Sequence, residues 1–388
     1  MPRLSQIRAT NFRNLNPDWV QFGTGINCIM GDNGQGKTNL LEAIHVLLNG
    51  KSFRKQAAFP KLLSVDCESC EIFLNGEFLV PGENRQTTLA LKMEHDKKNI
   101  WYKDNRLAKG RPGISSVFIN PFDAHHFFNT PAFRRSWIDN YLSQIDVTYR
   151  KTLGRYLVAL KFRNAILASP GHRQASKQID AIDPWIAQYT VYLIKARQTF
   201  IEELQQYIGP MFKNIFSEEH NLQLSLESKF MGASEEDILG FLLQNRAKDQ
   251  DARHTTQGAH RDDYALHFDG FNAFDFCSLG QQKASYLSLL FAYIEVFRYK
   301  LLSYPIVLVD DISGELDKVR WQRLVTYLQE KDFQVFITTA NDGFRKELER
   351  IEGAHQIWVC SGKVGTWPIH PGSNDDATEH GFTQQGQH

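Results

Sequence analysis

The residues best suited to chemistry form one glycine-rich segment near the N-terminus. Residues 31–38 read Gly-Asp-Asn-Gly-Gln-Gly-Lys-Thr, which satisfies the phosphate-loop pattern G-x-x-x-x-G-K-[ST]. Glycines let backbone N–H groups curl around phosphate oxygens, Lys37 reaches the β and γ phosphates, and the Thr38 hydroxyl can ligate magnesium. The pattern predicts binding of ATP and Mg²⁺; a glycine-rich turn ending in a surface lysine is the weaker alternative. The predicted ATP-binding residues are Gly31, Asp32, Asn33, Gly34, Gln35, Gly36, Lys37, Thr38 and Asn39, and Lys37 is also assigned to catalysis.

A pair of carboxylates follows an apolar run much later in the chain. The run Pro-Ile-Val-Leu-Val at 305–309 leads directly into Asp310 and Asp311. P-loop ATPases hold magnesium and orient water with carboxylates at the end of a buried strand. Asp310 is therefore predicted to be a metal ligand with Thr38, and Asp311 to polarise the attacking water. An Asp-Asp turn after a core strand is the alternative.

The distance between these two motifs is informative, because about 270 residues separate Thr38 from Asp310. Heads of the ABC and SMC class have this layout, with a serine-glycine signature upstream of the paired carboxylates. The segment 276–283, Phe-Cys-Ser-Leu-Gly-Gln-Gln-Lys, resembles that signature. Ser278 and the backbone N–H groups of Gly280 and Gln281 could then bind a γ-phosphate held by another subunit. A serine that only caps its own helix remains the alternative.

The surrounding sequence predicts elements that position these motifs. Short β-like runs at 4–9, 19–22 and 26–30 precede the glycine-rich loop, and apolar residues at helical spacing follow it to Asn49-Gly50. Short strands return over 71–120, long helical stretches fill about 130–250, and α/β texture resumes near Tyr264, with a helix at 286–297 and strands at 306–309, 334–338 and 356–360. The predicted fold is α/β, an ABC/SMC-type head built from both chain ends (1–125 with 255–365), with a helical insertion (126–254) and a disordered tail (366–388).

Composition limits the other functional classes. The 44 basic residues balance 44 acidic ones, so any nucleic-acid surface must be local. The five cysteines are scattered and odd in number, which favours a reducing cytoplasm over a disulfide framework. Cys67 and Cys70 form one Cys-x-x-Cys pair, which is interpreted as incidental because no second pair completes a zinc site. No apolar run is long enough for a membrane span, and no signal peptide is predicted.

Several further stretches resemble the RecF family of bacterial recombination and repair ATPases. They are 11–15 (Asn-Phe-Arg-Asn-Leu), 39–44 after the P-loop, 50–54 (Gly-Lys-Ser-Phe-Arg), 134–139 (Arg-Arg-Ser-Trp-Ile-Asp), 258–263 (Gly-Ala-His-Arg-Asp-Asp), the signature, and 310–317 with a D-loop-like Ser313 to Asp317. The chain departs from the family pattern at Phe122, where a glutamate is usual, at Ala259 in place of proline, and at Gly314 in place of the D-loop serine. The switch region Thr338 to Asn341 lacks the histidine of ABC transporters.

The resemblance implies a function in DNA recombination and repair, which the amino-acid composition alone does not indicate. It adds Arg13 to the ATP-binding residues and implies a slow Mg-dependent ATPase that forms an ATP-dependent homodimer on double-stranded DNA near gaps. RecR- and RecO-like partners and loading of a RecA-like recombinase are also implied. Basic and aromatic residues interleave at 53–55, at 101–106, and from 149 to 163, and these stretches are candidates for phosphate contacts.

Three rival interpretations come from other classes. A nucleotide kinase needs neither Ser278 nor the long separation between motifs. A transporter motor normally has a shorter helical insertion and a switch histidine. A scaffold that keeps ATP only as a structural ligand stays open, because motifs do not set a hydrolysis rate. DNA affinity that depends on salt and rises with ATP would favour the repair interpretation.

Overall fold

The computed structural model describes residues 2–54, 57–65, 67, 70–80, 86–110, 113–169, 175–217, 219–311, 316–339 and 342–365. Contacts divide the chain into two units. The terminal unit contains residues 2–113 together with the chain from 336 onward, and the central unit contains residues 114–335. The predicted tail at 366–388 lies outside the described residues, and the boundaries expected at 125 and 255 stay predictions.

An antiparallel sheet of six strands forms one part of the terminal unit. Its order is β2 (Trp19–Gln21), β1 (Arg3–Thr10), β4 (Glu71–Leu79), β5 (Gln86–Glu94), β6 (Ile100–Lys103) and β7 (Arg106–Leu107). Buried residues alternate along β4 and β5, as expected for a sheet with one face covered. The strand predicted at 4–9 and the short strands predicted over 71–120 are confirmed by β1, β4 and β5.

A second group of strands in the terminal unit carries the glycine-rich loop. β3 (Ile26–Met30) pairs in parallel with β14 (His355–Cys360), which pairs in turn with β15 (Lys363–Gly365), and β13 (Val335–Thr338) lies on the other side of β3. Helices α1 (Lys37–Asn49), α2 (Phe59–Leu62) and α12 (Asp342–Glu349) complete the unit. All five residues of β3 are buried, and four of them are apolar. The fifth, Asn27, accepts from the Gly23 N–H at 2.7 Å and donates to the carbonyls of Gly23 and Gly25.

Trp101 closes the far end of α1. Its indole N–H donates to the carbonyl of Leu47 at 3.0 Å, and the Asn99 amide donates to the carbonyl of Gly50 at 2.6 Å. Gly50 has φ of 69°, and a Cβ there would lie 2.5 Å from the Trp101 ring. The helix thus ends where the sequence predicts, at a left-handed glycine.

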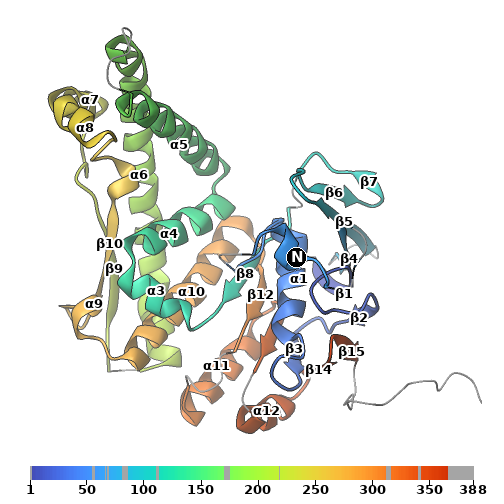
Figure 1. The fold of residues 1–388 in the computed structure, drawn as a ribbon. Coiled ribbons are helices and arrows are strands. Elements are labelled where there is room, and N and C mark those ends of the chain that lie inside the picture. The colour runs from blue at the N-terminus through green and yellow to red at the C-terminus, as the bar shows by residue number, and fades with distance from the viewer. Residues whose placement is uncertain are drawn as a thin grey trace, which may run out of the picture. The chain divides into compact units, whose positions relative to one another are not determined.

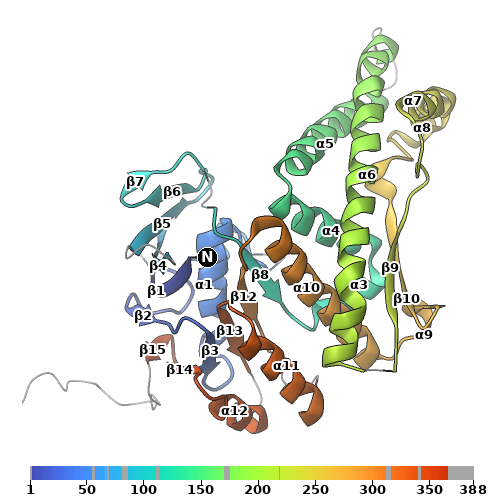
Figure 2. The same cartoon turned by 180° about the vertical axis from the view of Figure 1, so that it is seen from behind.

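The central unit is mainly helical. Its helices are α3 (Asp123–Asn129), α4 (Pro131–Ile145), α5 (Val147–Leu167), α6 (Ala175–Ile215), α7 (Glu235–Gln244), α8 (Arg246–Ala252), α9 (Ala273–Phe276), α10 (Leu279–Leu301) and α11 (Lys318–Glu330), with a 3₁₀ turn at Ala259–Arg261. α5 and α6 run side by side, and α7 and α8 lie next to α6 (Figures 1 and 2).

Two strand groups belong to the central unit. β12 (Ile306–Val309) pairs in parallel with β8 (Ser116–Ile119), and β9 (Leu222–Glu227), β10 (Asp263–Phe268) and β11 (Phe271–Asn272) form an antiparallel sheet. β9 was missed in the sequence, where 130–250 was interpreted as helical. Its alternation of buried and exposed residues is short, and only its partner β10, about 40 residues later, makes it a strand.

Candidate nucleotide site

The glycine-rich loop joins the buried end of β3 to the start of α1. Gly31, Gly34 and Gly36 have φ of 139°, 79° and 119°, conformations that side-chain-bearing residues rarely adopt. A Cβ on Gly31 would also lie 2.1 Å from the carbonyl oxygen of Val359 on β14. The loop can follow this path only with glycine at 31, so the sequence pattern reflects a real backbone requirement.

Lys37 is folded into this loop. Its side-chain nitrogen donates to the carbonyl of Gly31 at 2.6 Å and to that of Asp32 at 2.8 Å, and the residue is only 7% exposed. α1 begins without a side-chain cap and without an acidic residue in its first turn. An uncapped helix N-terminus and a buried ammonium group together create positive potential suited to phosphate.

The Asn14 side chain and the backbone of residues 361–362 fix the loop. The Gln35 side-chain oxygen accepts from the backbone N–H of Ser361 at 2.5 Å, and the N–H of Gly362 donates to the Gln35 carbonyl at 2.9 Å. Asn14 donates to the same carbonyl at 3.1 Å and accepts from the Asn39 amide at 2.7 Å. Asn14 belongs to the family-like stretch 11–15, but its sequence pattern did not indicate this bracing role.

Arg13, predicted to bind ATP, makes a two-pronged ion pair with Glu42. Its Nε and Nη2 atoms each donate to a Glu42 oxygen at 3.0 Å. The Glu42 carboxylate is completely buried, and the Ser52 hydroxyl also donates to it. The Arg54 guanidinium lies 3.6 Å from Glu42 and donates to Asn39 at 2.9 Å. Glu42 therefore connects α1 to two loops, a role that its place in the stretch 39–44 did not indicate.

The paired carboxylates lie at the end of β12 in the central unit. Asp310 is 7% exposed, and its backbone N–H donates to the carbonyl of Ile119 on β8 at 2.9 Å. Asp311 has φ of 49°, a left-handed conformation that non-glycine residues seldom adopt. The strand end thus turns sharply at the two predicted residues. The D-loop-like residues Ser313, Gly314 and Glu315 lie outside the described residues, as do Ala340 and Asn341 of the switch region.

Ser278 lies at the N-cap of α10, which begins earlier than the sequence pattern indicated. Its hydroxyl accepts from the Gln281 backbone N–H at 3.4 Å, and the Gln281 side chain accepts from the Ser278 N–H at 2.9 Å. This reciprocal capping box serves the helix itself, while the long 3.4 Å contact is weak. Gly280 follows in the first turn, and no side chain or other segment among the described residues lies within 4 Å of the position that a Cβ there would take. Phe122, the departure from the family pattern, is 54% exposed, and the Lys283 ammonium lies 5.5 Å from its ring centre.

The two family-like stretches 134–139 and 258–263, which are rich in Arg and Asp, meet inside the central unit. Arg134 pairs with Asp263 through two contacts of 2.7 and 2.8 Å, and Arg135 donates to the Asp262 carbonyl at 3.0 Å. Arg197 on α6 contacts both Asp139 and Asp262 at 2.8 Å. Burial alone would lower the pKa of Arg197, but Tyr264, Tyr149 and the two aspartates raise it above its ordinary value. These family-like stretches therefore hold helices α4 and α6 to β10.

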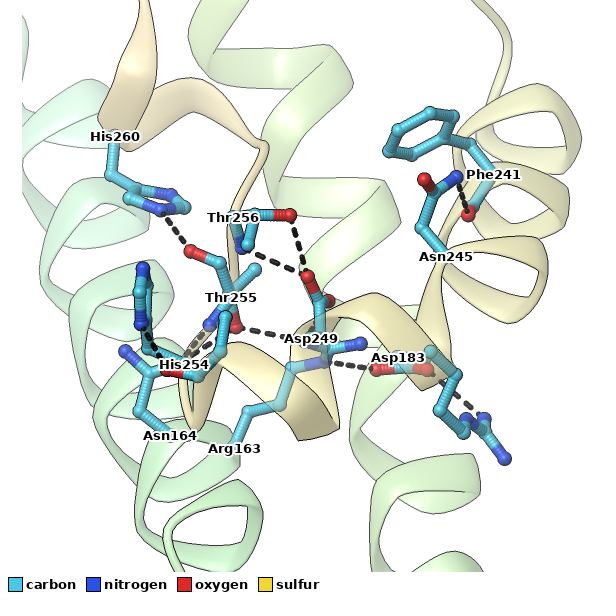
Figure 3. Close-up of polar contacts among 12 residues, drawn as sticks. Arg163, Asn164, Asp183, Phe241, Asn245, Asp249, His254, Thr255, Thr256 and His260 are labelled. Atoms are coloured by element: carbon cyan, nitrogen blue, oxygen red, sulfur yellow. Dashed lines mark hydrogen bonds and ion pairs between the residues drawn. The ribbon is translucent and has the colours of Figure 1, made fainter.

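A second buried cluster holds α5, α6 and α8 together. Arg163 is fully buried and donates to Asp183 and Asp249, each at 2.7 Å, as Figure 3 shows. Arg163 cannot reach a phosphate at the surface, although its stretch was a candidate for DNA contact. Two other members of the candidate stretches also make internal contacts: Tyr149 is buried, and the Trp101 indole N–H donates to Leu47 of α1. Sequence alone did not separate these internal residues from exposed neighbours such as Arg150 and Lys161.

His260 of the same region is held neutral. The Tyr156 hydroxyl donates to its Nδ1 at 2.7 Å, and its Nε2 donates to the Thr255 carbonyl at 3.1 Å. Burial lowers the pKa of His260 to about 4. At neutral pH the ring therefore carries no charge and links α5 to the turn before β10.

Among the described residues, no group of three or more His, Cys, Asp or Glu side chains is arranged to hold a metal ion. No helix in the described part of the chain combines the length and apolarity that a membrane span requires.

Comparison with known proteins supports one family. The family model "RecF/RecN/SMC N terminal domain" matches residues 3–357. The DNA replication and repair protein RecF of Staphylococcus aureus is 30% identical over 361 residues, which cover 89% of this chain and 95% of that protein. The RecF protein of Clostridium kluyveri is 29% identical over 367 residues, covering 93% and 99%.

Solved structures share the fold. A structure of the recombination mediator protein RecF with ATP, from the RecFOR pathway, has a TM-score of 0.81 at 24% identity and covers 94% of this chain and 99% of its own. The Smc head domain of Pyrococcus furiosus has a TM-score of 0.55 at 16% identity, covering 94% and 95%. The fold is thus the α/β fold of an ABC/SMC-type ATPase head, as predicted. With the family model and the Staphylococcus relative, the chain belongs to the RecF family.

Proposed function

We propose that this chain is an ATP-dependent DNA-binding protein of recombinational repair and replication. The observation that carries the proposal is the loop Gly31–Thr38, with three left-handed glycines and a lysine folded onto the loop's own carbonyls. This arrangement is built for a polyphosphate: Lys37 exchanges two carbonyl partners for phosphate oxygens, and the first N–H groups of α1 donate to the same ligand. Family membership makes ATP the expected nucleotide.

The magnesium and hydrolysis assignments rest on the sequence pattern. Thr38 and Asp310 supply the hard oxygen ligands that Mg²⁺ prefers, and bound Mg²⁺ would supply charge neutralisation of the phosphates. Asp311 orients and polarises the attacking water. Slow ATP hydrolysis would then set how long the dimer stays closed on DNA before it is released.

The dimer assignment rests on Ser278 and the N–H groups of Gly280 and Gln281. The capping contact from Gln281 to Ser278 is long at 3.4 Å, so the serine hydroxyl can exchange it for a stronger, charge-assisted bond to a phosphate on a second copy of the chain. ATP then acts as a clamp that favours a closed homodimer on double-stranded DNA near gaps. RecR- and RecO-like proteins are the expected partners, and loading of a RecA-like recombinase the expected outcome.

The experiment measures binding of a gapped DNA duplex by fluorescence anisotropy, with and without ATP and Mg²⁺, over a series of salt concentrations. We expect affinity to rise with ATP and to fall steeply with salt. Lys37→Ala should abolish the effect of ATP, while Lys61→Ala, which changes an exposed lysine on α2 in the same unit, should leave it intact. DNA affinity that ignores ATP would favour a scaffold that keeps ATP only as a structural ligand.

Asp311→Asn separates binding from hydrolysis. The variant should bind ATP normally and accumulate dimers because release requires turnover. ATP hydrolysis at the wild-type rate in this variant would remove Asp311 from the catalytic role.

A further inference from the structure

The central unit has an apolar groove far in sequence from every nucleotide motif. It lies between α5 and α6, and its volume is about 710 Å³. Its walls include Val158 and Phe162 of α5 and Ile182 and Trp185 of α6. Val158, Phe162 and Trp185 are 70%, 59% and 56% exposed, so a contiguous apolar surface faces solvent. Surfaces of this kind usually mark interaction sites.

α5 has two apolar stripes rather than one. The first contains Tyr149, Tyr156 and Leu160, which are buried. The second contains Val158 and Phe162, four residues apart and therefore on one face, and it lines the groove. A helix that only packed onto its own protein would need the first stripe alone. The second stripe has the spacing of a surface that receives a partner.

Gly154 lies four residues before Val158, on the same face of α5, and also lines the groove. Glycine is the least favourable helix residue apart from proline, so Gly154 makes α5 less stable than alanine would. No atom lies within 4 Å of the position that a Cβ on Gly154 would take, so packing inside the described chain does not require it. The missing side chain instead leaves room for the backbone of a visiting segment to approach α5.

The charges beside the groove have one sign. Lys151 and Arg155 of α5 line it, and the sequence of α5 contains no acidic residue. On the α6 side, Asp183 is buried against Arg163, and Asp180 pairs with Arg246 at 2.7 Å. Lys151 is the fifth residue of α5, close to the helix N-terminus, where a positive charge gains no stabilisation from the helix dipole. The basic rim is therefore suited to an acidic ligand.

We propose that the groove between α5 and α6 is a docking site for an acidic amphipathic helix of a partner protein. The apolar face of that helix packs on Val158, Phe162 and Trp185, with its backbone close to Gly154, and its carboxylates pair with Lys151 and Arg155. Among anionic ligands, an acidic protein segment fits an apolar groove better than duplex DNA or a bilayer does. Duplex DNA presents phosphates outside its stacked bases, and a bilayer is flat on this scale. Trp185, stacked on Tyr189 with ring centres 6.0 Å apart, is a preformed anchor.

The test uses a synthetic amphipathic helix with leucines at positions i, i+3, i+4 and i+7 and glutamates on both flanks. Its binding to the full chain is measured by fluorescence anisotropy beside the same helix with lysine flanks. Val158→Asp should weaken binding of the glutamate helix about tenfold or more, whereas Leu157→Asp, at a neighbouring residue that is 50% exposed and does not line the groove, should not. Arg155→Glu should weaken binding, whereas Lys161→Glu, on the same helix outside the groove, should not.

Gly154→Ala distinguishes docking from a structural role. The variant should raise the thermal midpoint of the protein, because alanine favours helix, and should weaken binding of the glutamate helix. A lower midpoint would show that the glycine serves the fold.

The proposal is overturned if the glutamate helix binds no better than the lysine helix, or if Val158→Asp and Leu157→Asp behave alike. It is also overturned if the groove variants instead reduce binding of a DNA duplex or of anionic phospholipid vesicles, since the groove would then serve another class of ligand.

Discussion

Glu42→Gln tests how α1, which follows the glycine-rich loop, is held to its surroundings. The Glu42 carboxylate is completely buried and accepts two 3.0 Å bonds from Arg13. Glutamine keeps the shape and one acceptor oxygen but removes the charge, so Arg13, which is 18% exposed, loses its counter-ion. Hydrogen bonds to charged groups contribute about 1.5–3 kcal/mol each, and part of one survives in the variant. We expect the free energy of unfolding to fall by about 2–3 kcal/mol.

Chemical denaturation of the wild type and the variant measures this loss. Arg13→Gln should cost a similar amount, because it removes the other half of the same pair. Arg54→Gln should cost less than about 1 kcal/mol, because the Arg54 side chain is 38% exposed and lies 3.6 Å from Glu42. An unchanged unfolding midpoint for Glu42→Gln, or equal losses for the two arginine variants, would refute the assignment of Glu42 as the centre of this cluster.

Three further outcomes follow from the geometry. Gly31→Ala should abolish nucleotide binding measured by titration with a fluorescent ATP analogue, because its Cβ would lie 2.1 Å from the Val359 carbonyl oxygen; binding as in wild type would contradict the loop geometry. Arg163→Met should lower the free energy of unfolding by about 3–5 kcal/mol in urea titrations, since it leaves buried Asp249 without a counter-ion and buried Asp183 with only the 3.2 Å contact to Arg246; a loss below about 1 kcal/mol would count against the buried cluster. His260 has a folded pKa of about 4, below its ordinary value of 6.5, so the unfolded chain takes up the proton first and stability falls as pH drops from 6.5 to 4, by about 3 kcal/mol in all. His260→Gln should flatten that part of the pH profile, and an unchanged slope would show that other groups cause it.

Local patterns predicted the nucleotide loop well because its chemistry is local. The strand Ile26–Met30, the three glycines and the end of α1 at Gly50 each follow from the conformations that neighbouring residues can adopt. The residues that brace the loop could not be predicted in this way. Asn14 and Ser361 reach it from segments that are distant in sequence, and only the folded chain brings them together.

Burial of charge was the other limit of the sequence. Arg150 and Arg163 both lie in α5, yet one is exposed and the other is completely buried against two aspartates, one of them 86 residues away. A helical period shows that two residues face different directions, but it does not show which face meets a buried carboxylate. The strand β9 was missed because its identity also depends on a distant segment: its partner β10 follows α7 and α8 in the sequence.

The proposed dimer places ATP between Gly31–Thr38 of one copy of the chain and Ser278 of a second copy. Light scattering of the full chain with and without ATP, Mg²⁺ and gapped DNA tests this arrangement. The wild type should double its mass when ATP is added. Lys37→Ala should fail to bind ATP, Ser278→Arg should still bind it as a monomer, and both variants should stay monomeric. A wild type that remains monomeric with ATP, or a Ser278→Arg variant that dimerises like the wild type, would contradict this arrangement.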